Sequence, residues 1–468
     1  MIKTWQIKEF ADAVSGKIIK DNGKNISGFS IDSRKITPDC MYIAIKGENH
    51  NGHKFCESAA EAGAGALLVS ELSFNCEKGD VSVILVEDTV TALQKAANYY
   101  RNSLKNTVFI GVTGSNGKTT TRSMIYHLLS DDSLCSMTKG NFNNHIGLPL
   151  TLLETNPKSD YAIIEMGMNH RNEITELCKI ANPDAAVISN VGPAHIGVLG
   201  TLGNIARAKS EIIEGLNAIG NIAVFPSDTE FTHIFEQAGK KCKLVSFGES
   251  NSSEFKITDI ISSADNTKFC VSWKTDKYKC LLNVPGRHNA FNAVAALALC
   301  SSLAPQKIEK FIKRLESYAP VSARMEKIIK DGVTIILDCY NANPASMKEA
   351  LRYLSDCDSN LKIAVIGDMR ELGEVSEEYH RILGKQASDA SLDYLLCLGD
   401  DVKYTVAEAL NNGMPANRAI KLNSETETAE LLRGKLQKGS TVLFKASRGM
   451  HFENIVQKIW PDLGKNLH

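Results

Sequence analysis

One stretch, which begins at Val108 and reads VFIGVTGSNGKTTTRSM, constrains the fold more than any other part of the chain. A run rich in β-branched residues ends in a glycine-containing turn, and Lys-Thr-Thr then opens a segment typical of a helix. Glycines let backbone N–H groups approach phosphate oxygens, and a helix N-terminus adds unsatisfied donors and partial positive charge. The stretch therefore predicts a phosphate-binding loop between a strand and a helix.

The loop departs from the usual spacing G-x-x-x-x-G-K-[ST], because Val112 stands five residues before Gly117. In such a loop Lys118 would supply a point charge to the β- and γ-phosphates, and Thr119 would supply a hydroxyl to Mg²⁺. The alternative is a glycine-rich turn with a solvated lysine, which three glycines followed by Lys-Thr-Thr make the less favoured interpretation. The candidates for ATP binding in this loop are Thr113, Gly114, Ser115, Asn116, Gly117, Lys118, Thr119 and Thr120.

The rest of the chain, 468 residues in all, has room for three domains. Strands alternate with helices around the loop, which predicts a central parallel sheet with helices on both faces, and a strand-rich patch follows from Phe255. Before the loop, helix-period segments such as SAAEAGAGALLVSE alternate with short apolar runs. After Tyr318 four more strand-then-loop units predict a Rossmann-like α/β domain. We expect an α/β protein with domains at residues 1–105, 106–319 and 320–468.

Composition limits the classes of partner and the compartment. A formal net charge of −1 gives no electrostatic reason to bind nucleic acid or an anionic membrane. The apolar run near Ala293 is too short to cross a bilayer, and the first residues lack the apolar core of a signal peptide. Twelve cysteines are scattered without a C-x-x-C pair, which favours reduced thiols over a disulfide framework or a zinc site. We expect a cytoplasmic monomer.

Three further side chains are ambiguous when taken alone. Glu165 ends the apolar run YAIIE, and a carboxylate at the carboxyl end of a parallel strand faces the crevice where ligands bind, so it could hold Mg²⁺. A glutamate in such a place is more often solvated or capping a helix. His195 and Lys209 are by default an ordinary histidine and a solvated surface lysine.

Taken together and in order, the motifs are more specific. TGSNGKTT, NFNNHIGLPLTLL, EMGMNH, NVGPAHIG and ARAKSEI resemble the Mur ligase family, which extends the peptidoglycan stem peptide. The phosphate loop of that family is T-G-[ST]-N-G-K-[ST], which explains the unusual spacing. The resemblance implies an ATP-dependent amide ligase with ATP and Mg²⁺ as cofactors. ATP would phosphorylate the acceptor carboxylate, and an amine would attack the acyl phosphate.

The resemblance also implies roles for residues of the central domain. Thr119 and Glu165 would serve the ATP-bound metal, and His195 would touch a second metal near the acceptor carboxylate. Lys209 matches a lysine that is carbamylated in the family and then orients metal. The asparagines Asn141, Asn143 and Asn144 would lie near the phosphates and the acceptor. The implied catalytic residues are Lys118, Asn144, His195 and Lys209.

Other segments carry the remaining implied contacts. Asn289 and Asn292 would contact adenine, Arg324 would reach the phosphates from the C-terminal domain, and Asp338 would bind the ribose. Tyr340 and Asn341 would line the same crevice. In the first domain Ser33, Arg34 and, less strongly, His53 would contact the UDP end of the acceptor, although an ordinary polar turn remains an alternative for this segment.

Within the family, the segments SARMEK, LDCYNANPASMKEAL, GDMRELGEVSEEYH and KASRGMHFENIV resemble members that add D-alanyl-D-alanine to UDP-N-acetylmuramoyl-tripeptide. The D-N-P-R motif of diaminopimelate-adding members is absent from the sequence. Departures from the family pattern are His145 in place of an acidic residue, a missing glutamate after His195, and Asn51 in place of aspartate. Three alternatives remain: a diaminopimelate- or lysine-adding ligase, a folylpolyglutamate-synthase-like ligase, or a regulatory nucleotide-binding ATPase.

Overall fold

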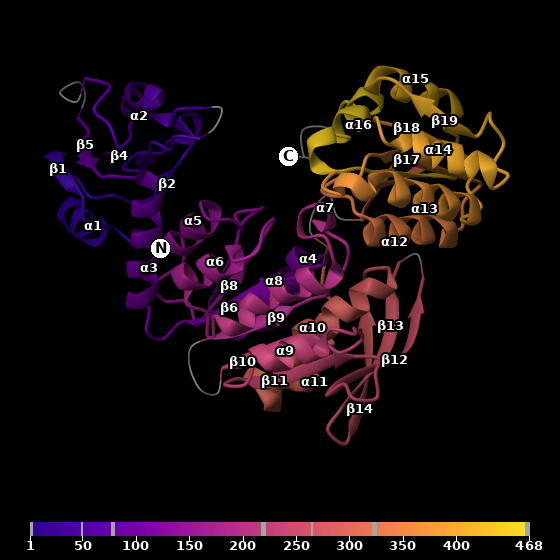
Figure 1. The fold of residues 1–468 in the computed structure, drawn as a ribbon, viewed down its shortest axis with the longest axis horizontal. Coiled ribbons are helices and arrows are strands. Elements are labelled where there is room, and N and C mark those ends of the chain that lie inside the picture. Colours follow the sequence, from indigo (N-terminus) through magenta and orange to yellow (C-terminus); the bar gives the residue numbers. More distant parts are fainter. Residues whose placement is uncertain are drawn as a thin grey trace.

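The chain folds into three α/β domains, each built on its own sheet (Figure 1). The computed structural model describes residues 3–47, 50–75, 80–216, 221–263, 265–320 and 325–463. The predicted boundaries near residues 105 and 320 fall in the stretches between the sheets. No helix in these described ranges is long and apolar enough to cross a bilayer.

The N-terminal sheet has the order β1-β5-β4-β3-β2, with β1 antiparallel and the other pairs parallel. The expected helix through SAAEAGAGALLVSE is wrong in its second half, because the chain turns at Gly63, where φ is +97°, and then enters a strand. The elements are α1 (Ile7–Val14), β1 (Lys17–Lys20), β2 (Phe29–Ser30), β3 (Met41–Ile43), α2 (Cys56–Glu61), β4 (Ala66–Val69), β5 (Ser82–Leu85) and α3 (Thr89–Ser103).

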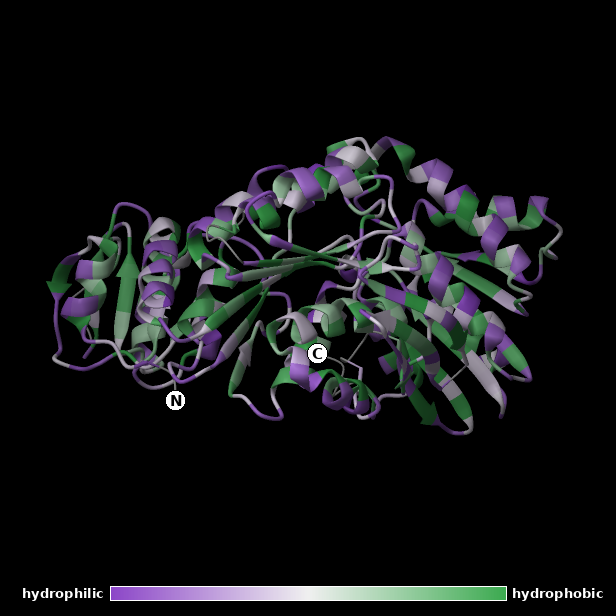
Figure 2. Cartoon of the chain, turned by 90° about the horizontal axis from the view of Figure 1, so that it is seen from below, coloured by the Kyte–Doolittle hydropathy of each residue, from purple (hydrophilic) through white to green (hydrophobic). Residues whose placement is uncertain are grey.

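The central sheet has the order β14-β13-β12-β11-β10-β9-β6-β8-β7. It is parallel from β7 to β12, which confirms the predicted parallel sheet, and it ends in an antiparallel extension where the strand-rich patch was expected. Apolar strands lie between helices on both sides (Figure 2). The elements are β6 (Val108–Thr113), α4 (Lys118–Leu129), β7 (Cys135–Met137), α5 (Gly147–Leu153), β8 (Tyr161–Glu165), α6 (Glu173–Ala181), β9 (Ala185–Ile188), α7 (Ile196–Leu199), α8 (Leu202–Glu214), β10 (Ile222–Pro226), α9 (Thr232–Ala238), β11 (Lys243–Gly248), β12 (Phe255–Ser262), β13 (Thr267–Trp273), β14 (Asp276–Leu282), α10 (Arg287–Leu303) and α11 (Ile308–Leu315).

Helix α3 joins the first two domains into one apolar core. Trp5 and Phe10 of the N-terminal domain belong to the same buried cluster as Phe109 of β6. The buried Arg101 of α3 donates to the carbonyl of Ala181 at 2.9 Å and forms an ion pair with Asp184. The N-terminal domain is therefore packed on the central domain through a continuous apolar interior.

The C-terminal sheet has the order β15-β16-β20-β17-β18-β19 and is parallel except for β15. Helices α12, α13 and α14 pack on one face, and α15 and α16 on the other. The carboxyl ends of β16 and β20 face the central domain. The elements are β15 (Glu326–Lys330), β16 (Val333–Leu337), α12 (Pro344–Asp356), β17 (Leu361–Gly367), α13 (Ser376–Asp389), β18 (Tyr394–Leu398), α14 (Val402–Asn411), β19 (Ala419–Leu422), α15 (Glu425–Lys435), β20 (Ser440–Lys445) and α16 (Glu453–Ile459).

Candidate active site

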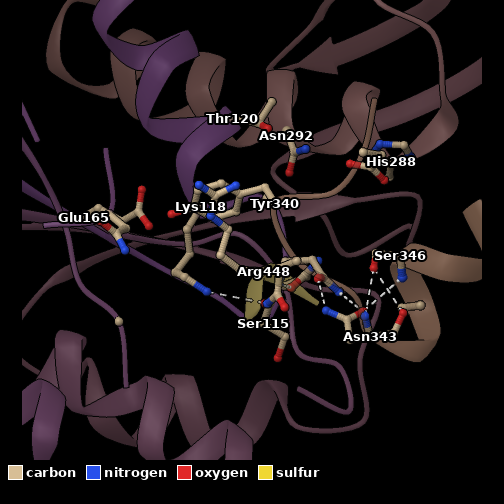
Figure 3. Close-up of a pocket in the computed structure, with 18 of the residues that line it drawn as sticks. Ser115, Lys118, Thr120, Glu165, His288, Asn292, Tyr340, Asn343, Ser346 and Arg448 are labelled. Carbon is tan, nitrogen blue, oxygen red and sulfur yellow. Dashed lines mark hydrogen bonds between the residues drawn. The ribbon is translucent and has the colours of Figure 1, made fainter. Parts of the chain in front are cut away.

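A cleft of about 490 Å³ lies between the central and C-terminal domains, within the size range of small-molecule sites (Figure 3). Both domains contribute polar side chains to its walls. Most residues that the sequence pattern predicted for ATP, metal or acceptor line this one cleft: Ser115, Asn116, Gly117, Lys118, Thr120, Asn141, Asn143, Asn144, Glu165, His195, Asn289, Asn292, Asp338, Tyr340 and Asn341.

The phosphate loop is held in place by the segment that follows β9. The Asn116 N–H donates to Asn190 Oδ1 at 2.8 Å, and the Ser115 hydroxyl donates to the carbonyl of Gly192 at 2.8 Å. Gly117 has φ +75° and lies against Asn292 so closely that a Cβ would overlap it. Only glycine satisfies both demands, so the loop presents its N–H groups and the N-terminus of α4 without rearrangement.

Glu165 is a buried carboxylate at the end of β8, where the sequence predicted it. Its oxygens accept hydrogen bonds from the Thr119 hydroxyl at 2.9 Å and from the Asn143 amide at 2.8 Å. Arg122 of α4 forms an ion pair with it at 3.0 Å, with both side chains almost fully buried. A buried charge needs such partners, and removing one of them is costly.

This arrangement fits Mg²⁺. Magnesium in nucleotide sites commonly uses one or two protein oxygens, with phosphate and water oxygens completing its shell. Glu165 and Thr119 provide a carboxylate and a hydroxyl side by side at the phosphate loop. In the part of the chain that the structure covers, no group of three or more His, Cys, Asp or Glu side chains is arranged to hold a metal ion.

Lys118 and Lys209 approach each other beneath the cleft. Lys118 Nζ donates to the carbonyl of Gly114 at 2.8 Å, across its own loop. Lys209 lies in α8 and is only 1% exposed. Burial lowers the pKa of the Lys209 ammonium well below its ordinary value, and the positive charge of Lys118 lowers that pKa further. The lowered pKa raises the fraction of Lys209 in the neutral amine form, which is the nucleophilic one.

His195 connects the two domains. Its Nδ1 lies 2.9 Å from Glu371 Oε2, and this contact lowers the pKa of the Glu371 carboxyl. Both residues have positive φ, +60° and +73°. Gly197, in the short helix α7 that His195 caps, lies against the backbone of Leu372, where a Cβ would overlap it. The loop of His195 is therefore packed directly on the C-terminal domain.

A second contact between the central and C-terminal domains joins α10 to α12, through His288 and Glu349. Asn289 and Asn292 lie in the first turns of α10 and share a hydrogen bond of 3.3 Å. The neighbouring His288 lies 3.5 Å from Glu349 of α12 and lowers the pKa of that carboxyl. The predicted adenine contacts therefore lie where the central domain again contacts the C-terminal one.

The third contact between these domains reaches the phosphate loop itself. Asn116 Nδ2 donates to Asn343 Oδ1 at 3.2 Å, and Asn343 Nδ2 donates back to Asn116 Oδ1. Asn343 is also the N-cap of α12, where it forms a capping box with Ser346. Asn343 was not among the predicted site residues, although an asparagine before the proline that opens a helix is an N-cap signal.

Asp338 lines the cleft but is already paired. The Lys445 ammonium, 1% exposed at the end of β20, donates to Asp338 Oδ2 at 2.5 Å and to the carbonyl of Asn341 at 3.2 Å. Lys445 was missed as a site residue. The signal in the sequence was a charged residue directly after the apolar run TVLF.

Several predicted site residues do not line the cleft, and one lies outside the described residues. Thr113, Gly114, Thr119 and Lys209 lie behind the lining of the cleft. Arg34 of the N-terminal domain is exposed and pairs with its neighbour Asp32, and Ser33 begins the same turn, η1 (Ser33–Lys35). The buried His53 ring accepts a hydrogen bond from the N–H of Ser70 at 2.9 Å, which is a structural role. Arg324 lies outside the described residues.

Comparison with known proteins identifies the family. Three family descriptions match in chain order: "Mur ligase family, catalytic domain" over residues 25–101, "Mur ligase middle domain" over 112–300 and "Mur ligase, glutamate ligase domain" over 323–448. The UDP-N-acetylmuramoyl-tripeptide–D-alanyl-D-alanine ligase of Bacillus subtilis is 36% identical over 97% of this chain and 98% of its own. The chain belongs to the Mur ligase family.

Other relatives match this Mur ligase in sequence and in structure over nearly its whole length. The ligase of the same name from Escherichia coli is 33% identical over 97% of this chain and 98% of its own. A crystal structure of MurF from Acinetobacter baumannii superposes with a TM-score of 0.88 at 29% identity, covering 98% of this chain and 99% of that one. MurF from Thermotoga maritima, solved in complex with ADP, gives 0.78 at 29% identity, covering 94% and 98%. The predicted three-domain fold is confirmed.

Proposed function

We propose that this Mur ligase joins D-alanyl-D-alanine to UDP-N-acetylmuramoyl-tripeptide, with hydrolysis of ATP to ADP and phosphate. The observation that carries the proposal is the full-length match to ligases of that name, combined with a cleft that gathers the phosphate loop, Glu165 and His195 from one domain and Asp338 from another. We infer a cytoplasmic monomer, because ATP is cytoplasmic and all of these groups belong to one chain.

In this reaction a carboxylate oxygen of the tripeptide attacks the γ-phosphorus of ATP, and the bond to the ADP oxygen breaks. The amine of the dipeptide then attacks the acyl carbon, loses a proton, and phosphate leaves as the C–O bond breaks. Two anions must approach each other in the first step. Lys118 and the N-terminus of α4 would offset that repulsion, which is how preorganised electrostatics lowers a barrier.

Mg²⁺, when bound, would neutralise phosphate charge and polarise the transferred group. Thr119 and Glu165 would hold it, and His195 would lie near the acceptor carboxylate. Lys209 is buried with a lowered pKa, so its amine can react with CO₂ to form a carbamate with loss of a proton. The resulting carbamate would place a negative charge next to Lys118, where it would attract metal.

The remaining predicted contacts complete the nucleotide site. Asn289 and Asn292 would contact adenine, Asp338 the ribose, and Tyr340 and Asn341 the wall of the same crevice, while Asn141, Asn143 and Asn144 would lie beside the transferred phosphoryl group. On the N-terminal domain, Arg34 is exposed and Ser33 is half-buried, and the two could bind the UDP end of the acceptor.

The test is ADP release measured with ATP, Mg²⁺ and UDP-N-acetylmuramoyl-tripeptide, with and without D-alanyl-D-alanine. We expect release to depend on both the acceptor and the dipeptide. Diaminopimelate, D-alanine and glutamate are offered in parallel as donors. A ligated product with diaminopimelate but not with the dipeptide would assign the chain to another branch of the family, and ADP release without any acceptor would indicate an ATPase.

A further inference from the structure

Arg448 is the one arginine among the described residues that line the cleft. It opens the short turn η5 (Arg448–Met450), which begins three residues after the last residue of β20, so it lies near the carboxyl end of a strand inside the C-terminal sheet. Figure 3 draws its side chain in the cleft together with Lys118 and Tyr340. A guanidinium in this position can contact a ligand that binds in the cleft between the two domains.

A buried carboxylate holds one end of this guanidinium. Glu453, the first residue of α16, is 3% exposed, and its Oε1 lies 3.1 Å from Arg448 Nη1. The other oxygen, Oε2, has no hydrogen-bond partner among the described residues. An ionised carboxylate in such surroundings depends on the adjacent cation. The side chain of Arg448 is itself 46% exposed, so the pair fixes Nη1 and leaves the Nε–Nη2 edge for a ligand.

The other cations among the described residues of the cleft have assigned partners. Lys118 belongs to the phosphate loop, and Lys445 is buried against Asp338. His195 and His288 face Glu371 and Glu349. Arg448 therefore remains as the group of the C-terminal wall whose geometry matches a carboxylate, because a guanidinium edge can donate two parallel hydrogen bonds to the two oxygens.

We propose that Arg448 binds the free carboxylate of the incoming dipeptide, with Glu453 as the residue that positions it. This inference rests on the proposed function, since the donor reacts through its amine and keeps its carboxylate as a permanent negative charge. Seating that charge on a fixed guanidinium would select a dipeptide acid over donors that lack a carboxylate at this distance from the amine.

The test compares D-alanyl-D-alanine with its C-terminal amide, D-alanyl-D-alaninamide, as donors in the ADP-release assay. For the natural chain we expect kcat/KM for the acid to exceed that for the amide by a factor on the order of 10². Arg448→Gln should lower kcat/KM for the acid to near that for the amide while leaving the amide value and the KM for ATP little changed. Glu453→Gln should reduce the preference partly, through KM for the acid.

Arg370 supplies a matched control. It is exposed on the loop after β17, its guanidinium lies against Gly449, and it does not line the cleft. Arg370→Gln should keep the full preference for the acid, and a loss of preference in this variant alone would overturn the assignment to Arg448. Circular dichroism checks that each variant is folded. If Arg448→Gln does not fold, Arg448→Lys, which keeps the charge but not the fork, should lose most of the preference.

Three other results would overturn the inference. The natural chain could use acid and amide equally well, Arg448→Gln could retain the preference, or the same variant could raise the KM for ATP with the preference intact, which would assign Arg448 to phosphate. In all three the dipeptide is still ligated. If the dipeptide stimulates no ADP release in the natural chain, the proposed function itself is wrong, and the inference falls with it.

Discussion

At the scale of single residues, two lysines define the chemistry of the cleft. Lys118 lies at the phosphate loop with its head on the carbonyl of Gly114, and Lys209 lies behind it in a nearly water-free position. Burial lowers the pKa of Lys209, the positive charge of Lys118 lowers it further, and both effects favour the neutral amine. In the proposed function, Lys118 would serve as a cation for phosphate and Lys209 as an amine that can be modified.

Lys118→Ala removes the charge that faces the transferred phosphoryl group. We expect ligase activity to fall by a factor on the order of 10² or more, because electrostatic stabilisation of the transition state is lost. The melting temperature should change little, since the lysine head donates to the carbonyl of Gly114 in its own loop at the cleft and fills no part of an apolar core. A folded variant that keeps nearly full activity would refute the assignment of the phosphate loop.

Lys209→Met should have opposite effects on activity and on stability. Activity should fall by a factor on the order of 10², and small carboxylates such as acetate should restore part of it by filling the vacated position. Because the folded pKa lies below the unfolded one, protonation favours the unfolded state of the natural chain below the ordinary lysine pKa of 10.5. The variant lacks this penalty and should melt higher at neutral pH.

The pH dependence of the difference in melting temperature gives a second test with the same variant. As pH rises toward 10.5, the unfolded lysine also becomes neutral, and the difference in melting temperature between Lys209→Met and the natural chain should shrink. Thermal melts at several values of pH measure it. A difference that grows with pH would mean that Lys209 is held as a charged group in the fold.

At the scale of elements, the start of α12 combines two tasks in one side chain. Asn343 caps the helix and also exchanges two hydrogen bonds with Asn116 of the phosphate loop. The cap needs only an acceptor oxygen, whereas the exchange with Asn116 needs an amide that both accepts and donates. The two tasks can therefore be separated by substitution.

Asn343→Asp keeps the capping oxygen but replaces the donor with a carboxylate oxygen facing Asn116. We expect stability close to that of the natural chain and a higher KM for ATP, because the carboxylate adds negative charge beside the phosphate site. Asn343→Ala should also cost about 1 kcal/mol of stability from the lost cap. Chemical denaturation and ATP titration measure both effects. Equal loss of stability in the two variants would show that capping is not the structural role.

Some elements could be predicted from the sequence, and some contacts between elements could not. Local patterns were sufficient for the phosphate loop, Glu165 at a strand end and the strands of the C-terminal domain, since each depends on neighbouring residues. The pairing of Lys445 with Asp338 was not accessible, because it joins strand ends 107 residues apart in the chain. The helix expected through Ala66–Val69 failed because pairing with β3 and β5 outweighs the helical period of a short apolar run.

At the scale of the whole molecule, the two boundaries between domains differ in kind. The N-terminal and central domains share an apolar core across α3, whereas the central and C-terminal domains meet through polar pairs around the cleft. Polar pairs open to water contribute little each, so the second boundary is the one that can open and close. Opening there would admit ATP, and closing would exclude water from the acyl phosphate.

The combined substitution Glu349→Gln and Glu371→Gln should weaken the closed arrangement. We expect a larger radius of gyration by small-angle X-ray scattering and a higher KM for ATP. Asp259→Asn, which removes an exposed pair with Lys277 far from the cleft, is the control and should change neither. An unchanged radius of gyration in the combined variant would mean that apolar contacts, such as those of Ile196, keep the domains closed.

Acid should open the same boundary. The pKa values of Glu349 and Glu371 are lowered by hydrogen bonds from His288 and His195, so their contribution to closure is present above the ordinary value of 4.5 and is lost as pH falls through the lowered values. Scattering at decreasing pH should show expansion below pH 4.5 in the natural chain. The combined variant should show a smaller change over that range.

The position of β20 has a consequence for how the protein is made. Ser440–Lys445 lies between β16 and β17, yet the ribosome adds it after every other strand of that sheet. A nascent chain therefore carries two apolar strand edges without a partner between them until translation has passed Lys445. During that interval the first two domains can already be compact while the third is exposed to chaperones and proteases. Cells that stall translation late in this message would accumulate a chain that contains the phosphate loop but cannot close over ATP.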